Sequence, residues 1–451
     1  MIKLKNIVVD KLFSNDARSA KIKKNIVYTF GLRFLAILAS FLLIRVTYDF
    51  LNNKAIYGVW LTILSVLSWI NYFDIGLGNG LRNKLAESIS NDEKEKGKIY
   101  VSTAYAVIFV LVILLTLIYL IVFPFLNWND IFNIELISQQ QLKLLLKVVV
   151  ILYLLKFLFS LINSISFASH DAMMPPLIQV ITNYLVLFIL LLLLKFGFSG
   201  IVVVGGVYSG VNAIIVFIAS ILLFLTRYRK IAPSFRFIRL EYVRDLFGLG
   251  IKFFILQIAA LVIFTTDNII ITRVLGPEYV TSYQVVFKLF NVFNIIAGII
   301  LTPIWSAYTE AFTKKDYDWM RSTLKKLMFL MIFLVIGVSI MVLLSKKIIL
   351  IWMGENLGIS YLLITLMAVS IVIRVWSAIF ANISNGINRI KVQLITSIIA
   401  GIINVPLSIY FAKNLGLGNS GVIIGTIISL SIFAIFGSID IYRILFRRKS
   451  I

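Results

Sequence analysis

The chain has 451 residues, of which 60% are hydrophobic and 14% charged, with a mean hydropathy of +0.99 and a formal net charge of +23. Soluble domains average about 45–50% apolar and about 25% charged residues, so this composition excludes an ordinary soluble protein and predicts a membrane-embedded chain. Cysteine is absent and His170 is the single histidine, which excludes disulfides, thiolate metal sites and most imidazole-based zinc chemistry. We therefore expect no metal site and no cofactor.

Residues 1–24 precede the first apolar run and hold seven Lys/Arg. No small-residue cleavage site follows that apolar run, so the pattern favours a retained cytoplasmic tail over a signal peptide. Part of this tail, IKLKNIVVDKLF, fits either a short amphipathic helix at the membrane surface or an unstructured segment.

Twelve apolar runs follow, each long enough to cross a bilayer as a helix, for which about 20 residues are needed. We expect these spans at about 25–44, 55–73, 99–126, 144–168, 176–196, 199–226, 249–272, 279–304, 327–345, 358–382, 389–412 and 419–442. The predicted fold class is an all-α integral membrane protein of about twelve transmembrane helices.

The basic residues in the connections predict the orientation of these spans. Alternate connections, taken as cytoplasmic, hold 29 Lys/Arg, whereas those taken as outer hold 8. Lys and Arg gather in the cytoplasmic connections of membrane proteins. We therefore expect both termini and the connections 74–98, 227–248 and 306–326 to be cytoplasmic.

The connection FDIGLGNGLRNKLAESISNDEKEKGK, residues 73–98, places three glycines beside basic residues. Gly76, Gly78 and Gly80 spell G-x-G-x-G, which is not the dinucleotide-binding fingerprint, and they follow a membrane span rather than a strand. We interpret them as a turn at the cytoplasmic surface and not as a phosphate-binding loop.

The spans divide into two halves of six at the basic connection. GLRFLAIL, at the start of the first half, is similar to GIKFFILQ at the start of the second, so that Arg33 lies opposite Lys252. Matched halves are typical of transporters whose site lies between them, although chance similarity of apolar segments is the alternative. We expect two pseudo-symmetric six-helix lobes around a central cavity. The predicted divisions are a tail at 1–24, a lobe at 25–226, a cytoplasmic linker at 227–248 and a lobe at 249–451.

Six Lys/Arg lie within the predicted spans: Arg33, Lys147, Lys156, Lys252, Lys288 and Arg374. Lys147 is near the outer end of its span, where its ammonium group reaches the interface. Lys252 and Arg374 are close enough to the cytoplasmic end either to do the same or to face a lumen. The other three are near the midplane, where a charge that faces lipid costs about 2.5–3.5 kcal/mol. We therefore predict that five of these residues line a lumen and bind substrate: Arg33, Lys156, Lys252, Lys288 and Arg374.

Asp267 is the one carboxylate well inside a predicted span. One acid cannot balance four or five lumen cations, so the excess positive charge suits an anionic substrate such as a phosphate or pyrophosphate head group. Asp267 is a candidate to bind a coupling H⁺ or Na⁺, or to neutralise a lumen lysine. Alternatively, it pairs with Lys252 or Lys288 and these residues are structural.

Several stretches resemble a known family. LNNKAIYGVWLTILS and FDIGLGNGLRNKLAESISNDE in the first half, and LGPEYVTSYQVVFKLF in the second, are similar to segments of the Wzx-type oligosaccharide-lipid (O-antigen) flippases. These belong to the multidrug/oligosaccharidyl-lipid/polysaccharide exporter superfamily, and the resemblance covers nearly the whole chain. LNNKAIYG departs from the family's usual LGPEEYG at the first outer connection.

This resemblance implies a transporter without catalytic residues. It implies that undecaprenyl-pyrophosphate-linked oligosaccharide repeat units move by alternating access from the inner to the outer leaflet of the bacterial inner membrane, for O-antigen or capsule-type polysaccharide. The implied partners are this lipid-linked oligosaccharide, membrane lipid, a coupling H⁺ or Na⁺ and polysaccharide polymerase machinery, with no nucleic acid.

Two alternatives remain open. A cation-coupled multidrug exporter of the same superfamily is disfavoured by the positive lumen. A membrane polysaccharide polymerase, which is an enzyme, is disfavoured because the longest outer connection, 127–143, has only about 17 residues and no loop carries paired carboxylates.

Overall fold

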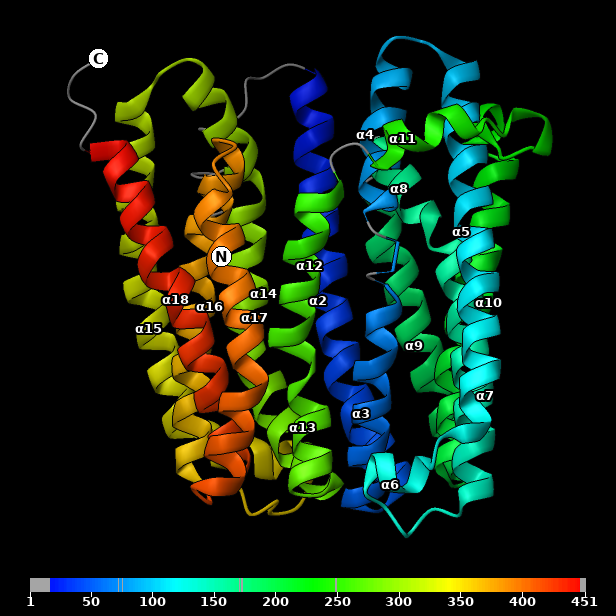
Figure 1. The fold of residues 1–451 in the computed structure, drawn as a ribbon, viewed down its shortest axis with the longest axis vertical. Coiled ribbons are helices and arrows are strands. Elements are labelled where there is room, and N and C mark those ends of the chain that lie inside the picture. Colours follow the sequence, from blue (N-terminus) through cyan, green and yellow to red (C-terminus); the bar gives the residue numbers. More distant parts are fainter. Residues whose placement is uncertain are drawn as a thin grey trace. The chain divides into compact units, whose positions relative to one another are not determined.

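A computed structural model of the protein describes residues 17–71, 73–74, 76–169, 171, 173–247 and 250–446. Side chains are described from residue 31 onward, except at 250–255, 302, 303, 306 and 310. Within these residues every regular element is helical (Figure 1).

The α-helices are α2 (Ala17–Leu51), α3 (Lys54–Ile70), α4 (Leu77–Ser90), α5 (Lys94–Val122), α6 (Trp128–Phe132), α7 (Gln139–Phe159), α8 (Leu161–Ala168), α9 (Met174–Lys195), α10 (Ile201–Leu225), α11 (Val243–Phe247), α12 (Gly250–Thr265), α13 (Asp267–Val274), α14 (Pro277–Thr313), α15 (Tyr317–Met353), α16 (Tyr361–Gly386), α17 (Lys391–Ile409) and α18 (Gly418–Phe446). The short elements are η1 (Phe123–Phe125), η2 (Arg229–Ile231), η3 (Phe235–Phe237), η4 (Leu240–Tyr242) and the π-helical turn η5 (Tyr410–Asn414).

Each predicted span coincides with an apolar helix, or with two consecutive helices in the case of 144–168 (α7 and α8) and 249–272 (α12 and α13). Eleven stretches of the described residues are long and apolar enough to cross a membrane, and α3 is a shorter apolar helix of 17 residues. The all-α membrane fold class is therefore confirmed. Some helices extend beyond the predicted spans: α15 continues through the predicted connection as far as Met353, where Gly354 ends it in the left-handed conformation with a φ of 73°.

Polar residues at the helix starts explain several of the boundaries. The side chain of Asn53 accepts hydrogen bonds from the backbone N–H groups of Ala55 and Ile56, which have no partner within α3. Ser360 caps α16 in the same way through the N–H group of Leu363. These caps start the helices at the edges of apolar runs, where a chain that leaves water needs its free N–H groups satisfied.

The chain divides into two compact units. Unit 1 contains residues 1–50, 74–125 and 143–250, and unit 2 contains 51–73, 126–142 and 251–451. This grouping differs from the predicted lobes at 25–226 and 249–451, because α3 and α6 group with the second half of the chain.

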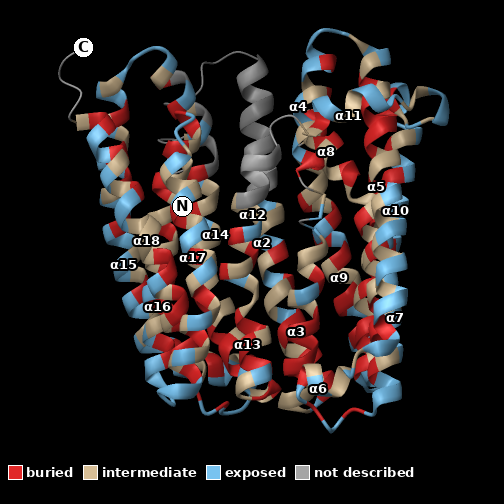
Figure 2. Cartoon of the chain, viewed as in Figure 1, coloured by how far each residue is buried: buried red, intermediate tan, exposed pale blue. Residues whose placement is uncertain are grey.

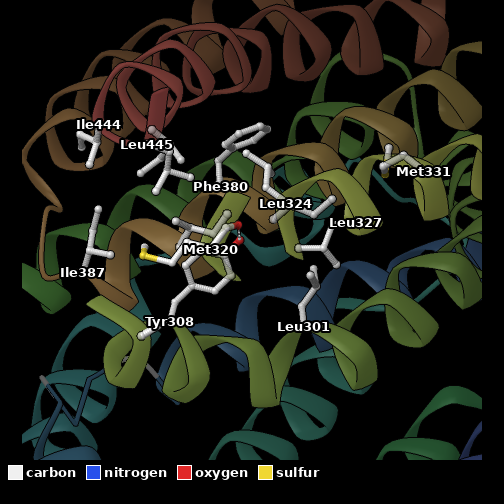
Figure 3. Close-up of a cluster of buried hydrophobic side chains, with 14 of the residues drawn as sticks. Leu301, Tyr308, Met320, Leu324, Leu327, Met331, Phe380, Ile387, Ile444 and Leu445 are labelled. Carbon is white, nitrogen blue, oxygen red and sulfur yellow. Dashed lines mark hydrogen bonds between the residues drawn. The ribbon is translucent and has the colours of Figure 1, made fainter. Parts of the chain in front are cut away.

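Unit 2 has a core of apolar side chains from α14, α15, α16 and α18 (Figure 3). Tyr308 of α14 is fully buried there, and its hydroxyl donates to the carbonyl oxygen of Met320 on α15 at 2.9 Å. The same core contains Leu324 of α15, Ile383 of α16 and Leu445 of α18. The helices of unit 2 are therefore held by close apolar packing at this end of α14.

Helix α3 packs in unit 2 through a glycine and a polar face. A Cβ atom at Gly58 would lie 1.7 Å from the carbonyl oxygen of Pro277, so that only glycine permits this approach of α3 to α14. Thr62 contacts Thr272 at 2.7 Å between their hydroxyl oxygens, and the indole N–H of Trp69 donates to Thr265 at 2.6 Å. Polar side chains at helical spacing thus attach α3 to α12 and α13.

Exposed residues form long stretches on several helices (Figure 2), and many of these residues are apolar. On α5 the exposed apolar residues begin at Phe109 and continue through Val122, and on α15 they run from Phe329 to Ile351. In a chain of this hydropathy such surfaces face lipid hydrocarbon, which makes their exposure favourable.

Candidate functional site

The seventh span is broken at Thr266, between the 16 residues of α12 and the 8 residues of α13, and the carboxylate of Asp267 lies directly after the break. Helix α12 ends at Thr265 and α13 begins at Asp267. The hydroxyl groups of Thr265 and Thr266 donate back to the carbonyl oxygens of Leu261 and Val262, four residues earlier, a contact that often bends helices. Broken spans are where membrane transporters commonly form their ion and substrate sites.

Asp267 is held by hydroxyl donors from two other helices of unit 2. Its side chain is only 3% exposed. The hydroxyl of Tyr283, on α14, donates to Oδ2 at 2.5 Å, and the hydroxyl of Thr426, on α18, lies 3.1 Å from Oδ1. A buried carboxylate needs such donors, because burial without them costs several kcal/mol. No ion pair within 4.0 Å joins Asp267 to a described side chain.

Asn404 of α17 extends this polar group. Its amide Nδ2 lies 3.4 Å from the hydroxyl of Thr426 and 3.5 Å from that of Ser429, both long contacts. Its carbonyl Oδ1 is buried and has no hydrogen-bond partner among the described residues. Carboxylate, amide and hydroxyl oxygens are hard ligands of the type that alkali cations take, whereas the described residues contain no cluster of three His, Cys, Asp or Glu that would hold a transition metal.

Arg374 supplies positive charge near Asp267. Its guanidinium carbon lies 4.4 Å from the ring centre of Phe264 and 5.3 Å from that of Phe287, so the cation is placed against two aromatic rings. Phe287 is one turn from Tyr283 on α14, which brings Arg374 near enough to interact electrostatically with Asp267. The guanidinium Nε is buried and has no hydrogen-bond partner among the described residues. Arg374 therefore retains unused donor capacity.

The remaining predicted cations of unit 2 are less constrained. Lys288 is half-buried on α14, and it makes no hydrogen bond or ion pair with any side chain that the structure describes. The alternative in which Asp267 pairs with Lys288 is thus not seen. The side chain of Lys252 lies outside the described residues, so its predicted role stays a prediction.

Unit 1 holds the other predicted cations. Arg33 is half-buried on α2 and has no ion pair within the described residues. The ammonium of Lys156, on α7, lies 4.4 Å from the ring centre of Tyr153, and Lys147 lies 5.5 Å from that of Phe123. No carboxylate neutralises Arg33 or Lys156 among the residues described. That the side chain of Arg33 lies opposite that of Lys252 stays a prediction.

The glycine-rich stretch forms a turn at Gly76 and then the first turn of α4, in unit 1. Gly76 adopts the left-handed conformation with a φ of 81° just before α4. The carboxylate of Asp74 accepts hydrogen bonds from the N–H groups of Gly76 and Gly78, each at 3.1 Å. A Cβ atom at Gly80 would lie 1.8 Å from the carbonyl oxygen of Leu246, so glycine permits close packing of α4 on α11. The predicted turn is confirmed at Gly76, whereas Gly78 and Gly80 lie within α4 and are helical. The N–H groups of Gly76 and Gly78 are used by the chain's own Asp74.

Sequence reasoning missed the partners of Asp267 and Arg374. Tyr283, Thr426 and Asn404 are ordinary polar residues in apolar helices, and no motif marks them. A signal was present in the spacing of Tyr283 and Phe287, which share one face of α14, but the sequence does not show which helix lies opposite that face.

Two solved structures illustrate the fold that this chain shares with known proteins. The fold is similar to that of an inward-facing multidrug resistance MATE family transporter of the MOP superfamily, with a TM-score of 0.73, 14% sequence identity, and coverage of 94% of this chain and 100% of that chain. An outward-facing structure of the same description has a TM-score of 0.66, 16% identity, and coverage of 95% and 97%. These likenesses show that the chain shares its overall fold with these solved structures.

The sequence model of the family described as "Polysaccharide biosynthesis protein" matches residues 22–309, and the chain belongs to that family. A second model, MatE, matches residues 253–410. The chain is 24% identical to a "Putative O-antigen export protein" of Yersinia pseudotuberculosis over 89% of its own length and 91% of that protein. It is 27% identical to a "Putative O-antigen transporter" of Salmonella typhimurium over 41% of its length and 43% of that protein. The resemblance found in the sequence is confirmed, and these names agree with a transporter rather than an enzyme.

Proposed function

We propose that this multi-pass membrane protein moves an undecaprenyl-pyrophosphate-linked oligosaccharide from the cytoplasmic to the outer leaflet of the bacterial inner membrane. The pyrophosphate is the part that the protein recognises by charge. The family match over 22–309 and the relatives named for O-antigen export support this choice of cargo.

The observation that carries the proposal is the set of span cations without acidic partners. Arg33, Lys156 and Lys288 make no ion pair with any described side chain. A lysine or arginine inside a membrane is costly unless an anion or water compensates it. A pyrophosphate supplies that compensation through charge-assisted hydrogen bonds, which are about twice as strong as neutral ones.

Transport then follows from alternating access between two lobes with both termini in the cytoplasm. Arg33 and Lys252, at matched positions in the opening spans of the two halves, hold the pyrophosphate from both sides of a central cleft. These contacts weaken as the lobes rock apart, so release to the outer leaflet requires only moderate affinity.

The test is complementation of a strain that lacks its own flippase, together with transfer of a fluorescent lipid-linked oligosaccharide in proteoliposomes. Arg33→Gln and Lys252→Gln should insert normally and lose transport, and Arg33→Lys should recover part of it because a point charge replaces a planar fork. Lys195→Gln removes the same charge from an exposed helix end and is the matched control. Full complementation by both glutamine variants at native expression would overturn the proposal.

Asp267 is proposed as the coupling residue. Its burial at the break of the seventh span and its hydroxyl neighbours suit the binding of H⁺ or Na⁺. Asp267→Asn should therefore change the dependence of transport on pH or on sodium, with expression unchanged. Transport with unchanged dependence on both would leave Asp267 as a charge partner of Arg374 alone.

A second candidate function is the export of cationic drugs. The MatE match at 253–410 favours it, whereas the unpaired span cations oppose it because they repel a cationic cargo. Drug resistance conferred on a sensitive strain, without transfer of the lipid-linked oligosaccharide, would support this second function and contradict the first.

A further inference from the structure

The segment 227–247 is fixed firmly to unit 1 although it lies between two membrane-spanning stretches. The N–H group of Ser234 donates to the hydroxyl of Ser102 at 3.0 Å, and the N–H group of Arg239 donates to that of Thr103 at 3.1 Å. The hydroxyl of Thr103 in turn lies 3.3 Å from the carbonyl oxygen of Arg239. Hydrogen bonds from two successive residues of α5 thus determine the path of this segment.

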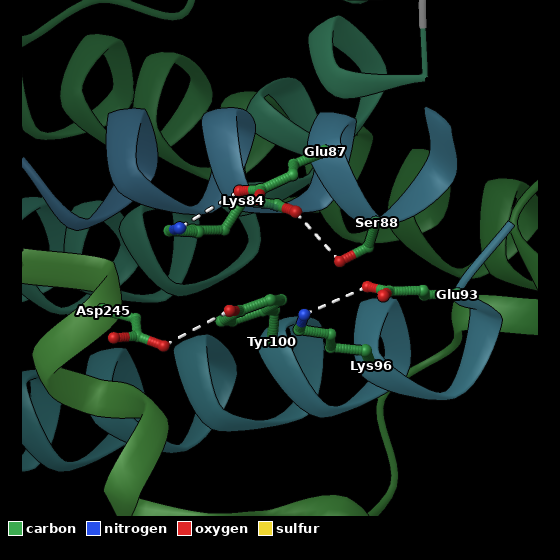
Figure 4. Close-up of polar contacts among 7 residues, drawn as sticks. All are labelled: Lys84, Glu87, Ser88, Glu93, Lys96, Tyr100 and Asp245. Carbon is green, nitrogen blue, oxygen red and sulfur yellow. Dashed lines mark hydrogen bonds and ion pairs between the residues drawn. The ribbon is translucent and has the colours of Figure 1, made fainter. Parts of the chain in front are cut away.

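Aromatic contacts complete the attachment. The ring of Tyr100 meets that of Tyr242 edge-on at 5.2 Å, and its hydroxyl donates to the carboxylate of Asp245 at 3.3 Å (Figure 4). The ammonium of Lys98 lies 4.5 Å from the ring centre of Phe237. Leu246 is buried against unit 1. A connection whose only role was to join two spans would not need so many contacts.

Two large apolar side chains of this fixed segment point away from the protein. Phe235 is 93% exposed and Leu240 is 77% exposed. The apolar residues Ile231 and Leu246 of the same segment are buried, so the inward positions are already filled. Exposing the side chains of Phe235 and Leu240 to water would be unfavourable, since apolar surface is more stable in a non-aqueous environment.

The level at which segment 227–247 contacts α5 indicates which environment surrounds Phe235 and Leu240. It contacts α5 from Lys98 to Thr103, and the strongly exposed apolar residues of α5 begin at Phe109. At 1.5 Å per residue Phe109 is about 10 Å beyond Thr103, while the basic residues at the start of α5 reach the segment itself through Lys98. Segment 227–247 therefore lies at the level where hydrocarbon gives way to lipid head groups.

The charge of the segment identifies the kind of lipid. It holds six Lys/Arg against two acidic residues, and four of the basic residues are exposed near the outward pair: Arg229, Lys230, Arg236 and Arg239. Basic side chains beside apolar ones are the pattern of segments that lie in the interface of anionic membranes.

We propose that segment 227–247 is an interfacial anchor that binds anionic phospholipid head groups through its exposed basic residues and inserts Phe235 and Leu240 among the acyl chains. The anchor holds α5 and α10 at a defined depth in the bilayer. This function is independent of the transported cargo.

The test uses the full chain in vesicles, and the absence of native cysteine makes single labels unambiguous. Nitroxide spin labels are placed at Phe235→Cys and Leu240→Cys, with Leu114→Cys as the hydrocarbon reference and Asn91→Cys as the aqueous reference, both exposed positions. Collision rates with oxygen and with a water-soluble nickel chelate are measured in pure phosphatidylcholine and in mixed phosphatidylcholine–phosphatidylglycerol vesicles.

The ratio of oxygen to nickel collision rates at 235 and 240 should exceed that at 91 severalfold, and should rise further when phosphatidylglycerol is present. Arg229→Gln combined with Arg236→Gln should remove the rise, whereas Lys195→Gln combined with Lys413→Gln should leave it. Ratios at 235 and 240 equal to that at 91 would overturn the anchor. Shielding from both reagents, with dipolar broadening between labels, would also overturn it and show a second copy of the chain on this surface.

Discussion

The carboxylate of Asp267 and the guanidinium of Arg374 interact electrostatically inside unit 2, but they form no direct ion pair. Tyr283 and Thr426 satisfy the carboxylate, and Phe264 and Phe287 flank the guanidinium. Each charged group is thus stabilised by its own neighbours. The two groups affect one another through their electrostatic interaction and share no hydrogen bond. That arrangement leaves both groups able to respond to an added cation or anion.

The coupling predicts non-additive stability changes. Arg374→Gln should destabilise the protein by about 1–3 kcal/mol, since it removes two cation–π contacts and the charge that compensates Asp267. Adding Asp267→Asn should cost less than the sum of the two single changes, by about 0.5–3 kcal/mol. Thermal unfolding in detergent measures this cycle. Lys288→Gln, which has no described carboxylate partner, should be additive with Asp267→Asn, and additivity in the Arg374 cycle would contradict the coupling.

The turn before α4 predicts a pH effect. Burial raises the pKa of Asp74 above its usual value of 3.8, while the hydrogen bonds from Gly76 and Gly78 act in the opposite direction. The folded state therefore holds the proton to higher pH than the unfolded state. The resulting stabilisation is present below the unfolded pKa and is lost as pH rises from about 4 through the folded pKa. The stability of the native protein relative to Asp74→Asn should fall between acidic and neutral pH.

Asp92 provides the control for this titration. Its contact with Lys94 lowers the pKa of the carboxyl, so the native protein should gain stability relative to Asp92→Asn as pH rises, by a smaller amount because Asp92 is exposed. Melting temperatures of both pairs across this range test the two signs. A difference between the native protein and Asp74→Asn that does not vary with pH would contradict the raised pKa.

At the scale of elements, close approaches at glycine decide which helices pack together. Gly58 places α3 against the start of α14, and Gly80 places α4 against α11. On α18, Gly421 and Gly425 are four residues apart and face the backbone near Phe411 and Ser408, a small-residue face of the kind that lets membrane helices come close. Such contacts compensate for the weak drive to associate that apolar helices have in lipid.

The α3–α14 contact gives a direct test. Gly58→Ala would force a methyl group into the carbonyl oxygen of Pro277, so we expect a loss of about 1–3 kcal/mol and a lower melting temperature. Gly206→Ala on α10 is the matched control, because its Cβ would meet nothing within 4 Å. It should be neutral or slightly stabilising, by about 0.5–1 kcal/mol. Equal melting temperatures for the two variants would show that α3 does not pack as described.

At the scale of the whole molecule, the excess of Lys/Arg in alternate connections predicts the orientation of the chain. The 29 to 8 distribution follows from the sequence, and the connections that carry it include the basic segment attached to α5. In our proposal the same basic residues both orient the chain and bind anionic lipid.

This orientation is tested by single-cysteine labelling in intact cells. Cysteines at positions 91 and 315, in the predicted cytoplasmic connections, should resist a membrane-impermeant maleimide until the cells are lysed. Cysteine at Lys195, in a predicted outer connection, should react at once. Strong labelling of position 91 from outside would reverse the topology and would also rule out transport in the proposed direction.

Much of the architecture is determined by the sequence alone. A membrane-spanning helix needs a long apolar run, and its backbone satisfies its own hydrogen bonds, so each span is visible without knowledge of its neighbours. This is why every predicted span coincides with one apolar helix or with two consecutive ones, why a turn at Gly76 was readable, and why Asp267 stood out as a lone carboxylate. Charge in the connections predicts orientation for the same reason, since it acts on each connection separately.

Only the tertiary structure decided which helices meet. Lipid solvates the surfaces of different apolar helices about equally well, so it does not select which helices pack together. The packing partners depend instead on where a glycine or a polar side chain faces its counterpart on another helix. The grouping of α3 with unit 2 rests on Gly58 and on the contact of Thr62 with Thr272, and the surroundings of Asp267 rest on Tyr283 and Thr426. These contacts join residues from 16 to 219 positions apart. A pattern read along one helix carries no information about the face that another helix presents to it.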